Sequence, residues 1–401
     1  MSLEGKRIVL GVSGGIAAYK VADLASKLSQ AGALVDVIMT ESAQKFVTPL
    51  TFAALTHRPV RTDLYEDWLG DDTGHVGLAH GADILVVAPA TAHTIARLAL
   101  GLSDDFLSAV YLSTQAPVLI VPAMESGMYL HPATQEHLDT LKKRGAYVML
   151  PDEGHLASGA SGVGRMPEPA AIMSEIKIVL GKGGALKGQR VVVTAGGTHE
   201  VIDPVRFVGN GSSGKMGYAI AEEALYNGAE VTLITGPVAL QPPYGVNTIK
   251  VTSAKQMEQA VREAVVDGKA DVLIMAAAVA DYAPAEIVEQ KIKKTGDTMT
   301  LNLARNPDIL GNLAKEELPG LLRIGFAAET QDLVENAREK LSKKKLDMII
   351  ANDAVASIGA DTSAITMITP NSGVDARPPL PKGENAKLII SKVAEMLRSR
   401  S

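Results

Sequence analysis

Residues 190–198 read Arg-Val-Val-Val-Thr-Ala-Gly-Gly-Thr, and residues 203–217 read Asp-Pro-Val-Arg-Phe-Val-Gly-Asn-Gly-Ser-Ser-Gly-Lys-Met-Gly. A run of β-branched residues that ends in glycines predicts a buried strand followed by a loop. Residues 218–225, Tyr-Ala-Ile-Ala-Glu-Glu-Ala-Leu, are typical of a helix. In open α/β sheets, a polar loop between a strand and a helix lies where anions and nucleotides bind. These stretches therefore predict an α/β fold with a ligand-binding loop.

The loop carries donors suited to an anion. Ser212, Gly214 and Lys215 offer a hydroxyl, an unhindered backbone N–H and an ammonium group. Arg206 and Asn210 add a cation and an amide, which suit a carboxylate or a developing oxyanion. Glycine spacing alone fits an ordinary surface turn about equally well, so the prediction depends on the whole string.

The whole string closely resembles the phosphopantothenate–cysteine ligase half of the bifunctional coenzyme A biosynthesis proteins. In that family a DPVR-F-x-x-N-x-SSGKMG block follows a TAG-G-T turn, and the resemblance covers about residues 187–397. It implies that 4′-phosphopantothenate attacks CTP to give an acyl-cytidylate and pyrophosphate, with Mg²⁺ on the phosphates, before the amine of cysteine attacks. It also implies that Asn210 and Arg206 are catalytic and that Ser212, Gly214 and Lys215 bind CTP.

Two further positions match the family's nucleotide motifs. Asp281 follows an apolar run and is a candidate helix N-cap; its match to the A-V-A-D-Y aspartate implies contact with the ribose or the metal. Lys291 begins a short basic run, which by itself is usually a solvated face. Its match to the P-E-K-I-K-K loop implies a contact with phosphate, although Glu289-Gln290 replaces the usual Pro-Glu.

The remaining residues of the implied CTP site follow later strands. Pro307 is expected at the first helical position, with Asp308 as a cap. Phe326 is either a core residue or a ring that packs on the base, and Lys340 and Lys344 are four apart on one helical face. The resemblance implies that CTP is bound by Asn306, Pro307, Asp308, Ile309, Phe326, Lys340 and Lys344. Ser363 stands where the family usually has asparagine.

Composition bounds the class of protein. The 401 residues are 46% hydrophobic and 21% charged, which is typical of a packed globular protein with two or three domains. A net charge of −6 argues against a general nucleic-acid or anionic-membrane binder. The chain has no cysteine and no apolar run near about 18 residues, so we expect no disulfide, no thiolate metal site and no membrane span. The N-terminus lacks a signal-peptide core, so we expect a cytoplasmic protein.

The first half alternates predicted strands with helices. Strands are expected at residues 6–12, 34–40, 83–90 and 116–122, each followed by a small-residue loop, which predicts a parallel, doubly wound sheet. The loops are Ser13-Gly-Gly15, Thr40-Glu-Ser42, Ala88-Pro-Ala-Thr91 and Pro122-Ala-Met124. Any one of them fits a plain turn, but together at one sheet edge they favour a nucleotide or flavin.

These motifs resemble the homo-oligomeric flavin-containing cysteine decarboxylases, which share G-x-S-G-G-I-A-A-Y-K, A-P-A-T-A-x-T and P-A-M-x-x-x-M. The resemblance implies an FMN cofactor held at a subunit interface of a trimer-based assembly. The implied FMN-binding residues are Ser13, Gly14, Gly15, Thr40, Pro89, Ala90, Thr91, Ala92 and Ala123. His75 falls where the family has its catalytic histidine, although a lone histidine before an apolar run is usually structural.

Three positions depart from the family. Glu125 replaces the asparagine of P-A-M-N that binds the substrate carboxylate, and Ser158 replaces the flap cysteine that protonates the product. Asp104 stands at a position that is commonly asparagine. A serine hydroxyl is far less acidic than a cysteine thiol, whose pKa is about 8.5, so Ser158 is a poor general acid at neutral pH. A charged Glu125 would repel a carboxylate unless burial keeps it protonated.

Two hypotheses explain these departures. In the first, the half is an active variant in which a neutral, buried Glu125 supplies both the hydrogen bond and the proton, so that Glu125, Ser158 and His75 form the catalytic set. In the second, only the ligase is active, and the first half is a non-catalytic FMN-binding oligomerisation or partner-binding domain, as in the halotolerance-type regulators that resemble this fold.

A glycine-rich break at residues 181–184 follows a predicted helix at 170–180, which places the domain boundary near 183–186. We therefore expect two doubly wound Rossmann-like domains with mainly parallel sheets. They are a flavodoxin-like flavoprotein at 1–182, with decarboxylase activity, and a ligase domain at 183–401. The resemblance implies a homo-oligomer, with trimeric first halves and dimeric ligase halves forming a dodecamer.

Other enzyme classes fit less well. A dehydrogenase with two Rossmann domains predicts G-x-G-x-x-G followed by an acidic residue about twenty positions on, which neither half shows cleanly. A ligase specific for ATP stays open, because base selection usually depends on backbone contacts. The expected partners are therefore small molecules, namely 4′-phosphopantothenate, cysteine and CTP, and neither a nucleic acid nor a membrane.

Overall fold

The computed structural model of the chain describes residues 2–65, 74–294, 297–357, 359–370 and 373–400. The chain divides into two compact units, Met1–Gly181 and Lys182–Ser401. Each unit has its own hydrophobic cores and its own sheet. The division falls directly after the helix that the sequence predicted over residues 170–180.

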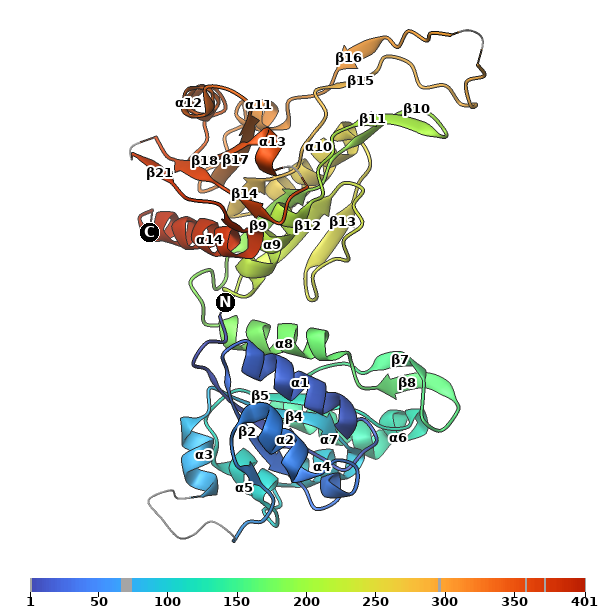
Figure 1. Ribbon diagram of the computed structural model, residues 1–401, viewed down its shortest axis with the longest axis vertical. Helices are drawn as coiled ribbons and strands as arrows, with labels where there is room; N and C mark the ends of the chain where they lie inside the picture. Colours follow the sequence, from blue (N-terminus) through green and yellow to red (C-terminus); the bar gives the residue numbers. More distant parts are fainter. Residues whose placement is uncertain (1, 66–73, 295–296, 358, 371–372, 401) are drawn as a thin grey trace. The chain divides into compact units, whose positions relative to one another are not determined.

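The first unit is built on a six-stranded sheet in the order β3-β2-β1-β4-β5-β6, with every neighbouring pair parallel (Figure 1). The strands are β1 (Arg7–Val12), β2 (Leu34–Met39), β3 (Val60–Arg61), β4 (Ile84–Ala90), β5 (Val118–Pro122) and β6 (Tyr147–Val148). The order reverses between β1 and β4. This is the Rossmann order, which differs from the 2-1-3-4-5 order of flavodoxin.

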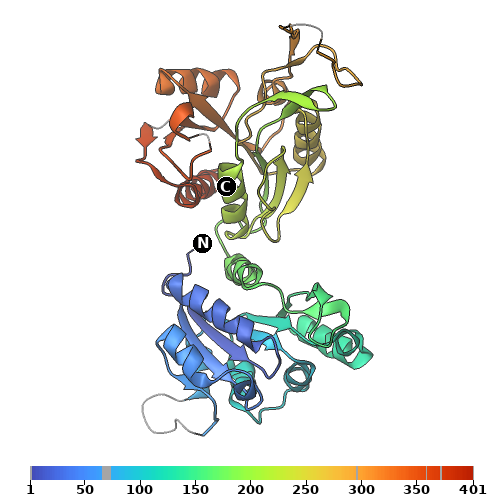
Figure 2. The ribbon, with the colours of Figure 1, turned by 45° about the vertical axis from the view of Figure 1, so that its right-hand side comes forward.

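Helices cover both faces of this sheet because side chains alternate across each strand. Figure 2 shows helices on either side of the sheet. Ile8 and Leu10 of β1 pack with one group of helices, which includes α1 and α8, whereas Val9 packs with the other group. The helices of the unit are α1 (Ala18–Gln30), α2 (Pro49–Thr56), α3 (His75–Gly81), α4 (Ala92–Leu100), α5 (Phe106–Ser113), α6 (Ser126–Leu130), α7 (Pro132–Lys143) and α8 (Pro169–Gly181), with a 3₁₀ turn at Ala43–Lys45.

An antiparallel hairpin follows β6. Its strands are β7 (Asp152–His155) and β8 (Ser161–Arg165). The N–H of Met124 donates to the carbonyl of Gly164 at 3.0 Å, which joins β8 to the chain just before α6. The base of the hairpin is therefore attached to the loop that follows β5.

The second unit has an eight-stranded sheet in the order β13-β12-β9-β14-β17-β18-β20-β21. Neighbours from β13 to β18 are parallel, and the last two strands are antiparallel. The strands are β9 (Arg190–Ala195), β12 (Glu230–Thr235), β13 (Asn247–Lys250), β14 (Val272–Met275), β17 (Leu322–Glu329), β18 (Met348–Asp353), β20 (Thr366–Ile368) and β21 (Val374–Ala376). The order reverses between β9 and β14, where α/β sheets bind ligands.

Helices also cover both faces of the second sheet. Val191 and Val193 of β9 pack with α9 and α14, whereas Val192 packs with α10 and α11. The helices are α9 (Lys215–Leu225), α10 (Ala254–Arg262) with a π turn at Glu263–Asp267, α11 (Ile309–Leu313), α12 (Leu333–Lys343), α13 (Ala354–Ser357) and α14 (Lys382–Arg398). A Cβ on Gly217 would lie 2.6 Å from the Cβ of Ala195, so glycine lets α9 approach β9 closely.

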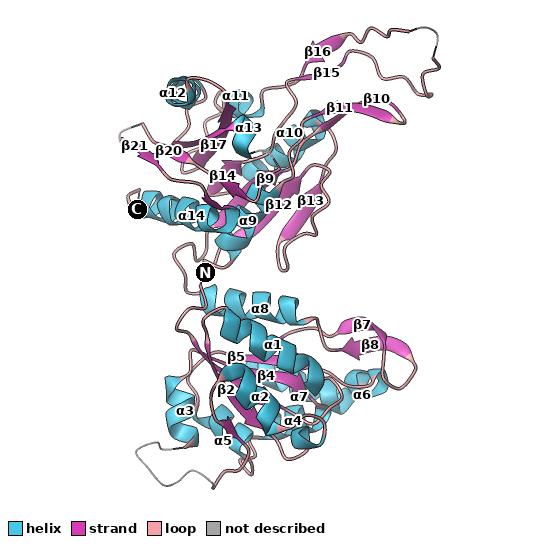
Figure 3. Cartoon of the chain, viewed as in Figure 1, coloured by secondary structure: helices cyan, strands magenta, loops and turns pink. Residues whose placement is uncertain are grey.

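Three short antiparallel pairs extend the second unit. They are β10 (His199–Asp203) with β11 (Arg206–Gly209), β15 (Tyr282–Pro284) with β16 (Leu303–Arg305), and β19 (Thr362–Ser363) with β22 (Leu380–Pro381). The first two pairs project beyond the main sheet (Figure 3). The sequence predicted only a polar loop between β9 and α9, which is wrong over β10 and β11.

The predicted class, doubly wound α/β with mainly parallel sheets, is confirmed by the two sheets. Two local predictions are wrong. Asp281 is not a helix cap, because the next residues form β15. Pro307 is not the first helical residue, because Asp308 is the N-cap of α11 and accepts a hydrogen bond from the N–H of Gly311 at 3.0 Å. Among the described residues, no helix combines the length and apolar character needed to cross a membrane.

Candidate functional site

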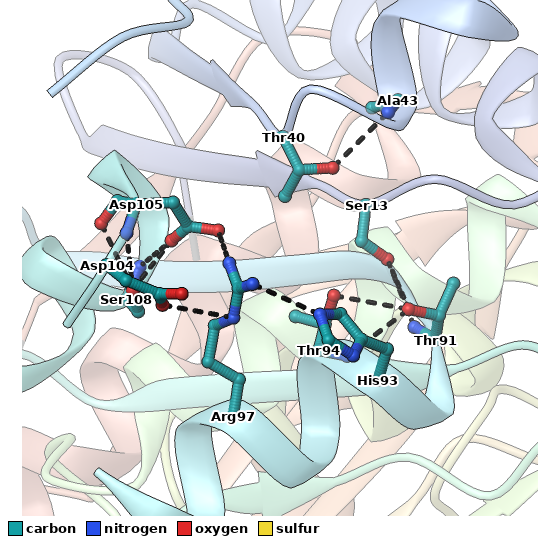
Figure 4. Close-up of polar contacts among 10 residues, drawn as sticks. All are labelled: Ser13, Thr40, Ala43, Thr91, His93, Thr94, Arg97, Asp104, Asp105 and Ser108. Carbon is teal, nitrogen blue, oxygen red and sulfur yellow. Dashed lines mark hydrogen bonds and ion pairs between the residues drawn. The ribbon is translucent and has the colours of Figure 1, made fainter. Parts of the chain in front are cut away.

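The ends of β1 and β4 are tied together by Ser13. Its buried hydroxyl donates to the carbonyl of Pro89 at 2.6 Å and accepts from the N–H of Thr91 at 3.0 Å (Figure 4). A hydroxyl has one proton to donate, so Ser13 holds the two loops in place and has no second proton for a bound phosphate. Thr91 then caps α4, where its hydroxyl accepts from the N–H of Thr94 at 3.3 Å.

The loop after β2 joins the same edge. A Cβ on Gly14 would lie 2.3 Å from the Cβ of Ser42 and 2.8 Å from its carbonyl carbon, so only glycine lets these two backbones meet. Thr40 accepts from the N–H of Ala43 at 3.3 Å, which fixes the turn. The structure therefore brings the Ser13–Gly15 and Thr40–Ser42 loops together.

The loop after β5 completes this edge. The N–H of Ala123 donates to the carbonyl of Ala90 at 3.0 Å, and Ala92 begins α4 beside it. All the residues that the sequence assigned to FMN thus lie at, or directly after, the carboxyl ends of strands of one sheet. A site for a flat, phosphorylated ligand is expected at such an edge.

His75 begins α3. Its Nδ1 is buried and has no hydrogen-bond partner among the described residues, and its ring stands edge-on to Phe106 at 6.4 Å. A buried polar atom without a partner is costly unless a ligand satisfies it. This orphaned nitrogen fits a site in which a bound group approaches His75.

Asp104 lies in an ion-pair cluster and not in a free substrate position. The guanidinium of Arg97 contacts Asp104 at 3.2 Å and also pairs with Asp105, while its Nη2 lies 3.1 Å from Nε2 of His93 (Figure 4). Asp105 in turn caps α5 with Ser108. The negative charge that replaces the family's asparagine is therefore offset only in part, because Asp104 shares Arg97 with Asp105.

Glu125 is the N-cap of α6. Its carboxylate accepts from the N–H of Gly127 at 2.6 Å and of Met128 at 3.3 Å, and its side chain is exposed. The sequence hypothesis required an apolar pocket that keeps Glu125 protonated, and the single chain does not provide one. Any such burial has to come from a bound ligand or another copy of the chain.

Ser158 lies in the turn between β7 and β8 with an exposed side chain. Among the described residues, no hydrogen bond joins Ser158, Glu125 and His75, so the structure does not assemble these three into one hydrogen-bonded set. The base of the hairpin is held more firmly: Glu168 accepts from Lys20 at 2.9 Å and from Arg165 at 2.5 Å. The hydrogen bond from Lys20, with that from Arg165, keeps the pKa of Glu168 below its usual range.

The second unit contains a cavity of about 720 Å³ at the point where the strand order reverses. This is within the range of small-molecule sites, about 300–1,000 Å³. The structure brings together here all but two of the predicted ligase residues: Asn210, Ser212, Gly214, Lys215, Asp281, Asn306, Pro307, Asp308, Ile309, Phe326, Lys340 and Lys344.

The amides of the cavity are held by backbone carbonyls. Nδ2 of Asn210 donates to the carbonyl of Ala278 at 3.2 Å, and Nδ2 of Asn306 donates to that of Ala280 at 2.8 Å. Asn306 is buried, whereas Asn210 is exposed to the cavity. Asn306 therefore positions the segment that carries Asp281, and Asn210 is accessible to a ligand.

The α12 end of the cavity is lined by ion pairs. Nζ of Lys344 contacts Asp308 at 3.0 Å, and Nζ of Lys340 contacts Glu329 at 2.5 Å. Burial raises the pKa of Asp308, but the N–H of Gly311 and the Lys344 ammonium outweigh it and hold this pKa below its usual range. Phe326, in β17, lines the cavity with a half-buried side chain that also packs against the core between the sheet and helices α9 and α14.

Arg206 and Lys291 are the two predicted residues that do not line the cavity. Arg206 contacts Asp203 at 3.1 Å and reaches the carbonyl of Ile292 at 3.4 Å, while the N–H of Ile292 donates to Asp203 at 3.2 Å. Burial raises the pKa of Asp203, but the N–H groups of Val205, Ile292 and Arg206 and the Arg206 charge hold it below its usual range. The β10–β11 turn and the Lys291 segment are thus one connected piece.

Sequence reasoning missed Asp361 and Lys382 near the α9 end of the cavity. Asp361 pairs with the predicted Lys215 at 2.5 Å, and Lys382, the first residue of α14, lines the cavity together with Lys215. Lys382 follows the stretch Pro378-Pro-Leu-Pro381, which gave no motif. Its only signal was a lysine at a helix start, where cations are unfavourable.

The residues present fit a magnesium ion only as one that bridges substrate phosphates. The carboxylate of Asp281 lines the cavity and has no side-chain partner among the described residues. In the described ranges, no group of three histidine, aspartate or glutamate side chains could enclose a metal. Mg²⁺ commonly takes one or two carboxylates together with phosphates and water, and Asp281 can supply such a carboxylate.

Comparison with protein families agrees with the two units. The family of flavoproteins matches residues 1–181, and the family described as DNA/pantothenate metabolism flavoprotein C-terminal domain matches residues 186–397.

Curated relatives match over nearly the whole chain. The coenzyme A biosynthesis bifunctional protein CoaBC of Vibrio vulnificus is 45% identical over 398 residues, which is 98% of this chain and 96% of the relative. The protein of the same name from Bacillus subtilis is 44% identical over 400 residues, 98% of either chain. A crystal structure of the C-terminal domain of CoaBC is 42% identical, covers 54% of this chain and 99% of that chain, and has a TM-score of 0.47.

Proposed function

The chain belongs to the family of coenzyme A biosynthesis bifunctional proteins, and from this premise we propose that it catalyses two successive steps of that pathway. The second unit condenses 4′-phosphopantothenate with cysteine, and the first unit decarboxylates the product to 4′-phosphopantetheine. The match to bifunctional relatives over 98% of the chain favours two activities over a ligase with a non-catalytic first half.

In the ligase step, the carboxylate of 4′-phosphopantothenate attacks the α-phosphate of CTP. A P–O bond forms, pyrophosphate leaves, and the acyl-cytidylate is attacked by the amine of cysteine, which releases CMP and forms the amide. Asp281 would hold Mg²⁺, which would supply neutralisation of the charge on the nucleotide phosphates. Phe326, Lys340 and Lys344 hold the cytidine end, and Asn210 donates to the acyl phosphate oxygens.

Arg206 and Lys291 enter the ligase step together. Both belong to the piece that Asp203 holds, and both lie outside the cavity of the single chain. They approach the phosphates when that piece closes over bound nucleotide or meets the cavity of a second copy. Lys291 then contacts phosphate, and Arg206 shares the acyl oxygens with Asn210.

In the decarboxylation step, FMN when bound supplies the reversible two-electron oxidation of the cysteinyl thiol that allows CO₂ to leave. The chain's own residues do the rest. The loops of Ser13–Gly15, Thr40 and Pro89–Ala92 with Ala123 hold the flavin, and His75 acts as the base. Glu125 contacts the substrate carboxylate and supplies the proton to the product once ligand or a neighbouring copy covers it, and Ser158 stands at the position of the family's cysteine.

We also propose a homo-oligomer, with trimeric first units and dimeric second units combined in a dodecamer. The hairpins β10–β11 and β15–β16 support an interface in the second unit, because they expose apolar side chains. Val205 is 63% exposed, Phe207 52% and Leu303 45%. Native mass spectrometry of the full chain tests this assembly, and a monomer at micromolar concentration would refute it.

The observation that carries the proposal is the cavity where the strand order reverses between β9 and β14. It is lined by twelve of the predicted residues, which come from five segments of the chain. The test is purified full-length protein with 4′-phosphopantothenate, cysteine, FMN and either CTP or ATP, followed by product mass. We expect phosphopantothenoylcysteine with CTP in the absence of FMN, and loss of CO₂ with FMN. No amide product with either nucleotide would reject the ligase assignment.

A further inference from the structure

Two lysines share the end of the cavity formed by α9 and α14. Lys215 is the first residue of α9 and Lys382 is the first residue of α14, and both line the cavity. The two helices pack against each other within one core. Their N-termini therefore open on the same space, and each presents an ammonium group there.

This arrangement is electrostatically costly without an anion. The N-terminus of a helix carries partial positive charge, which disfavours a cation in the first turn. Burial, and then repulsion by the Lys215 ammonium, lower the pKa of Lys382, while the Asp361 charge offsets part of that shift. The two ammonium groups also reach carbonyls two residues apart, because Nζ of Lys215 donates to Gly359 at 3.4 Å and Nζ of Lys382 donates to Ser357 at 3.3 Å.

The negative charge at this end is loosely placed. Asp361 contacts Nζ of Lys215 at 2.5 Å, but its side chain is 86% exposed. Nζ of Lys382 donates to the backbone carbonyl of Ser357 at 3.3 Å. At the α12 end, by contrast, Glu329 and Asp308 each pair with a separate lysine. The α9 end thus has two cations and one carboxylate that lies mostly in solvent.

We propose that Lys215 and Lys382 form a subsite for a terminal phosphate group. In the absence of ligand, Asp361 forms an ion pair with Lys215, and the bound phosphate takes the place of that carboxylate. The inference deepens the ligase function proposed above and depends on it for the identity of the ligand. Two substrates carry such a group: the nucleotide, at its terminal phosphate, and 4′-phosphopantothenate, as a phosphate monoester. Lysine acts on either as a point charge with rotatable donors.

The main test is Lys382→Gln in the full-length protein, with Lys387→Gln as the matched control. Lys387 is on the same helix but pairs with Glu384 and lies outside the cavity. Loss of one charged hydrogen bond to phosphate weakens binding about ten- to hundredfold. We expect that loss in Lys382→Gln only. The unfolding midpoint of the ligand-free protein should be equal to or above that of the wild type in Lys382→Gln, because a repelled cation is removed, and unchanged in Lys387→Gln.

Calorimetry and kinetics distinguish the two phosphate sources. If the nucleotide supplies the phosphate, Lys382→Gln raises the Kd for CTP and for inorganic pyrophosphate but leaves the Kd for CMP unchanged. If the acyl substrate supplies it, the KM for 4′-phosphopantothenate rises and the Kd for CTP is unchanged. If both constants stay within twofold of the wild type, the subsite does not exist.

Asp361→Asn tests the replacement of carboxylate by phosphate. Removal of the competing charge should tighten binding of the same ligand by up to about fivefold, and unchanged or weaker binding would overturn Asp361's role. The outcome is separate from that of the ligase proposal. Wild-type protein that binds pyrophosphate through Lys382 but forms no amide would leave the subsite standing and reject the ligase.

Discussion

Ser158 stands at an exposed turn of the β7–β8 hairpin, where a related sequence would have a thiol. A thiol has a pKa of about 8.5 and can donate a proton near neutral pH, whereas an aliphatic hydroxyl cannot do so readily. The chemical difference at this position is therefore larger than the difference in size.

Ser158→Cys should raise the rate at which the first unit forms 4′-phosphopantetheine. A positioned general acid typically contributes about 10²–10⁴-fold, so we expect at least a tenfold gain. The measurement is CO₂ release and product mass with FMN and phosphopantothenoylcysteine. Ser161→Cys, at the first residue of β8 just after the turn, is the control. An equal gain in both variants would contradict a specific role for position 158.

Asn210→Asp should block the second half of the ligase reaction. The substitution replaces an amide donor in the cavity with a carboxylate that repels the acyl phosphate oxygens. Losing one preorganised donor costs about 10²–10³ in rate. Mass spectrometry should then detect accumulated acyl-cytidylate after CTP is added. Asn227→Asp, whose amide contacts Glu223 at the end of α9, is the control. Wild-type turnover in Asn210→Asp would refute the assignment.

The residues of the cavity could be predicted because each follows a strand end, and parallel strands deliver their carboxyl ends to one edge. Arg206, Lys291 and Lys382 show the limit of this reasoning. Arg206 and the segment of Lys291 lie outside the cavity because Asp203 accepts hydrogen bonds from Arg206 and from the N–H of Ile292. Lys382 lines the cavity because α14 packs against α9. Sequence spacing contains neither the ion pair nor the packing. The hypothesis of a buried Glu125 is not supported, because its carboxylate caps α6 at the surface, and the motif alone does not predict that helix start.

The β10–β11 hairpin owes its turn to Asp203, which accepts from the N–H of Val205 at 2.8 Å and of Arg206 at 2.9 Å. A third donor, Ile292, fixes the Lys291 segment to the same carboxylate. Asp203 thus connects two elements that are far apart in sequence. The loss of its charge should release both.

Asp203→Asn should make the stability of the protein less dependent on pH on the acid side. The folded pKa of Asp203 lies below its usual 3.8, so its stabilisation is complete above that value and is lost as pH falls through the folded pKa. We expect the variant to have a lower urea midpoint than the wild type at pH 7. The two midpoints should converge toward pH 3.

The control for that measurement is Asp375→Asn, an exposed partner of Arg377 on the far edge strand. The variant Asp203→Asn should also raise the KM for CTP, because the Lys291 segment loses its anchor. A constant gap between the midpoints from pH 7 to pH 3 would contradict the role of the ionised carboxylate.

The strands of both main sheets were largely predictable, because buried parallel strands are continuous apolar runs such as Ile84–Ala90 and Val272–Met275. The short hairpins were not predictable. The strands β15, β16, β19 and β22 have two or three residues each, too few for a period of two to be recognised. The antiparallel edge of β20 and β21 was missed for the same reason.

The whole chain consists of two units with separate cores, which predicts independent folding. Residues 1–181 and 182–401, produced separately, should each unfold cooperatively. FMN should raise the unfolding midpoint of the first fragment only, and CTP that of the second only. At 100 times its Kd a ligand adds about 2.7 kcal/mol of stability, enough for a shift of several degrees. Stabilisation of the first fragment by CTP would contradict the assignment of the sites.

The exposed turn at Ser158 also gives the protein a means of observation. Since the chain has no cysteine, Ser158→Cys would introduce its only sulfhydryl, at a point that solvent reaches. A maleimide fluorophore would therefore attach to every copy at one known place. The emission of the fluorophore would change if the turn of the β7–β8 hairpin moves when flavin or substrate binds. Glu168, through Lys20 and Arg165, would keep the base of the hairpin in place.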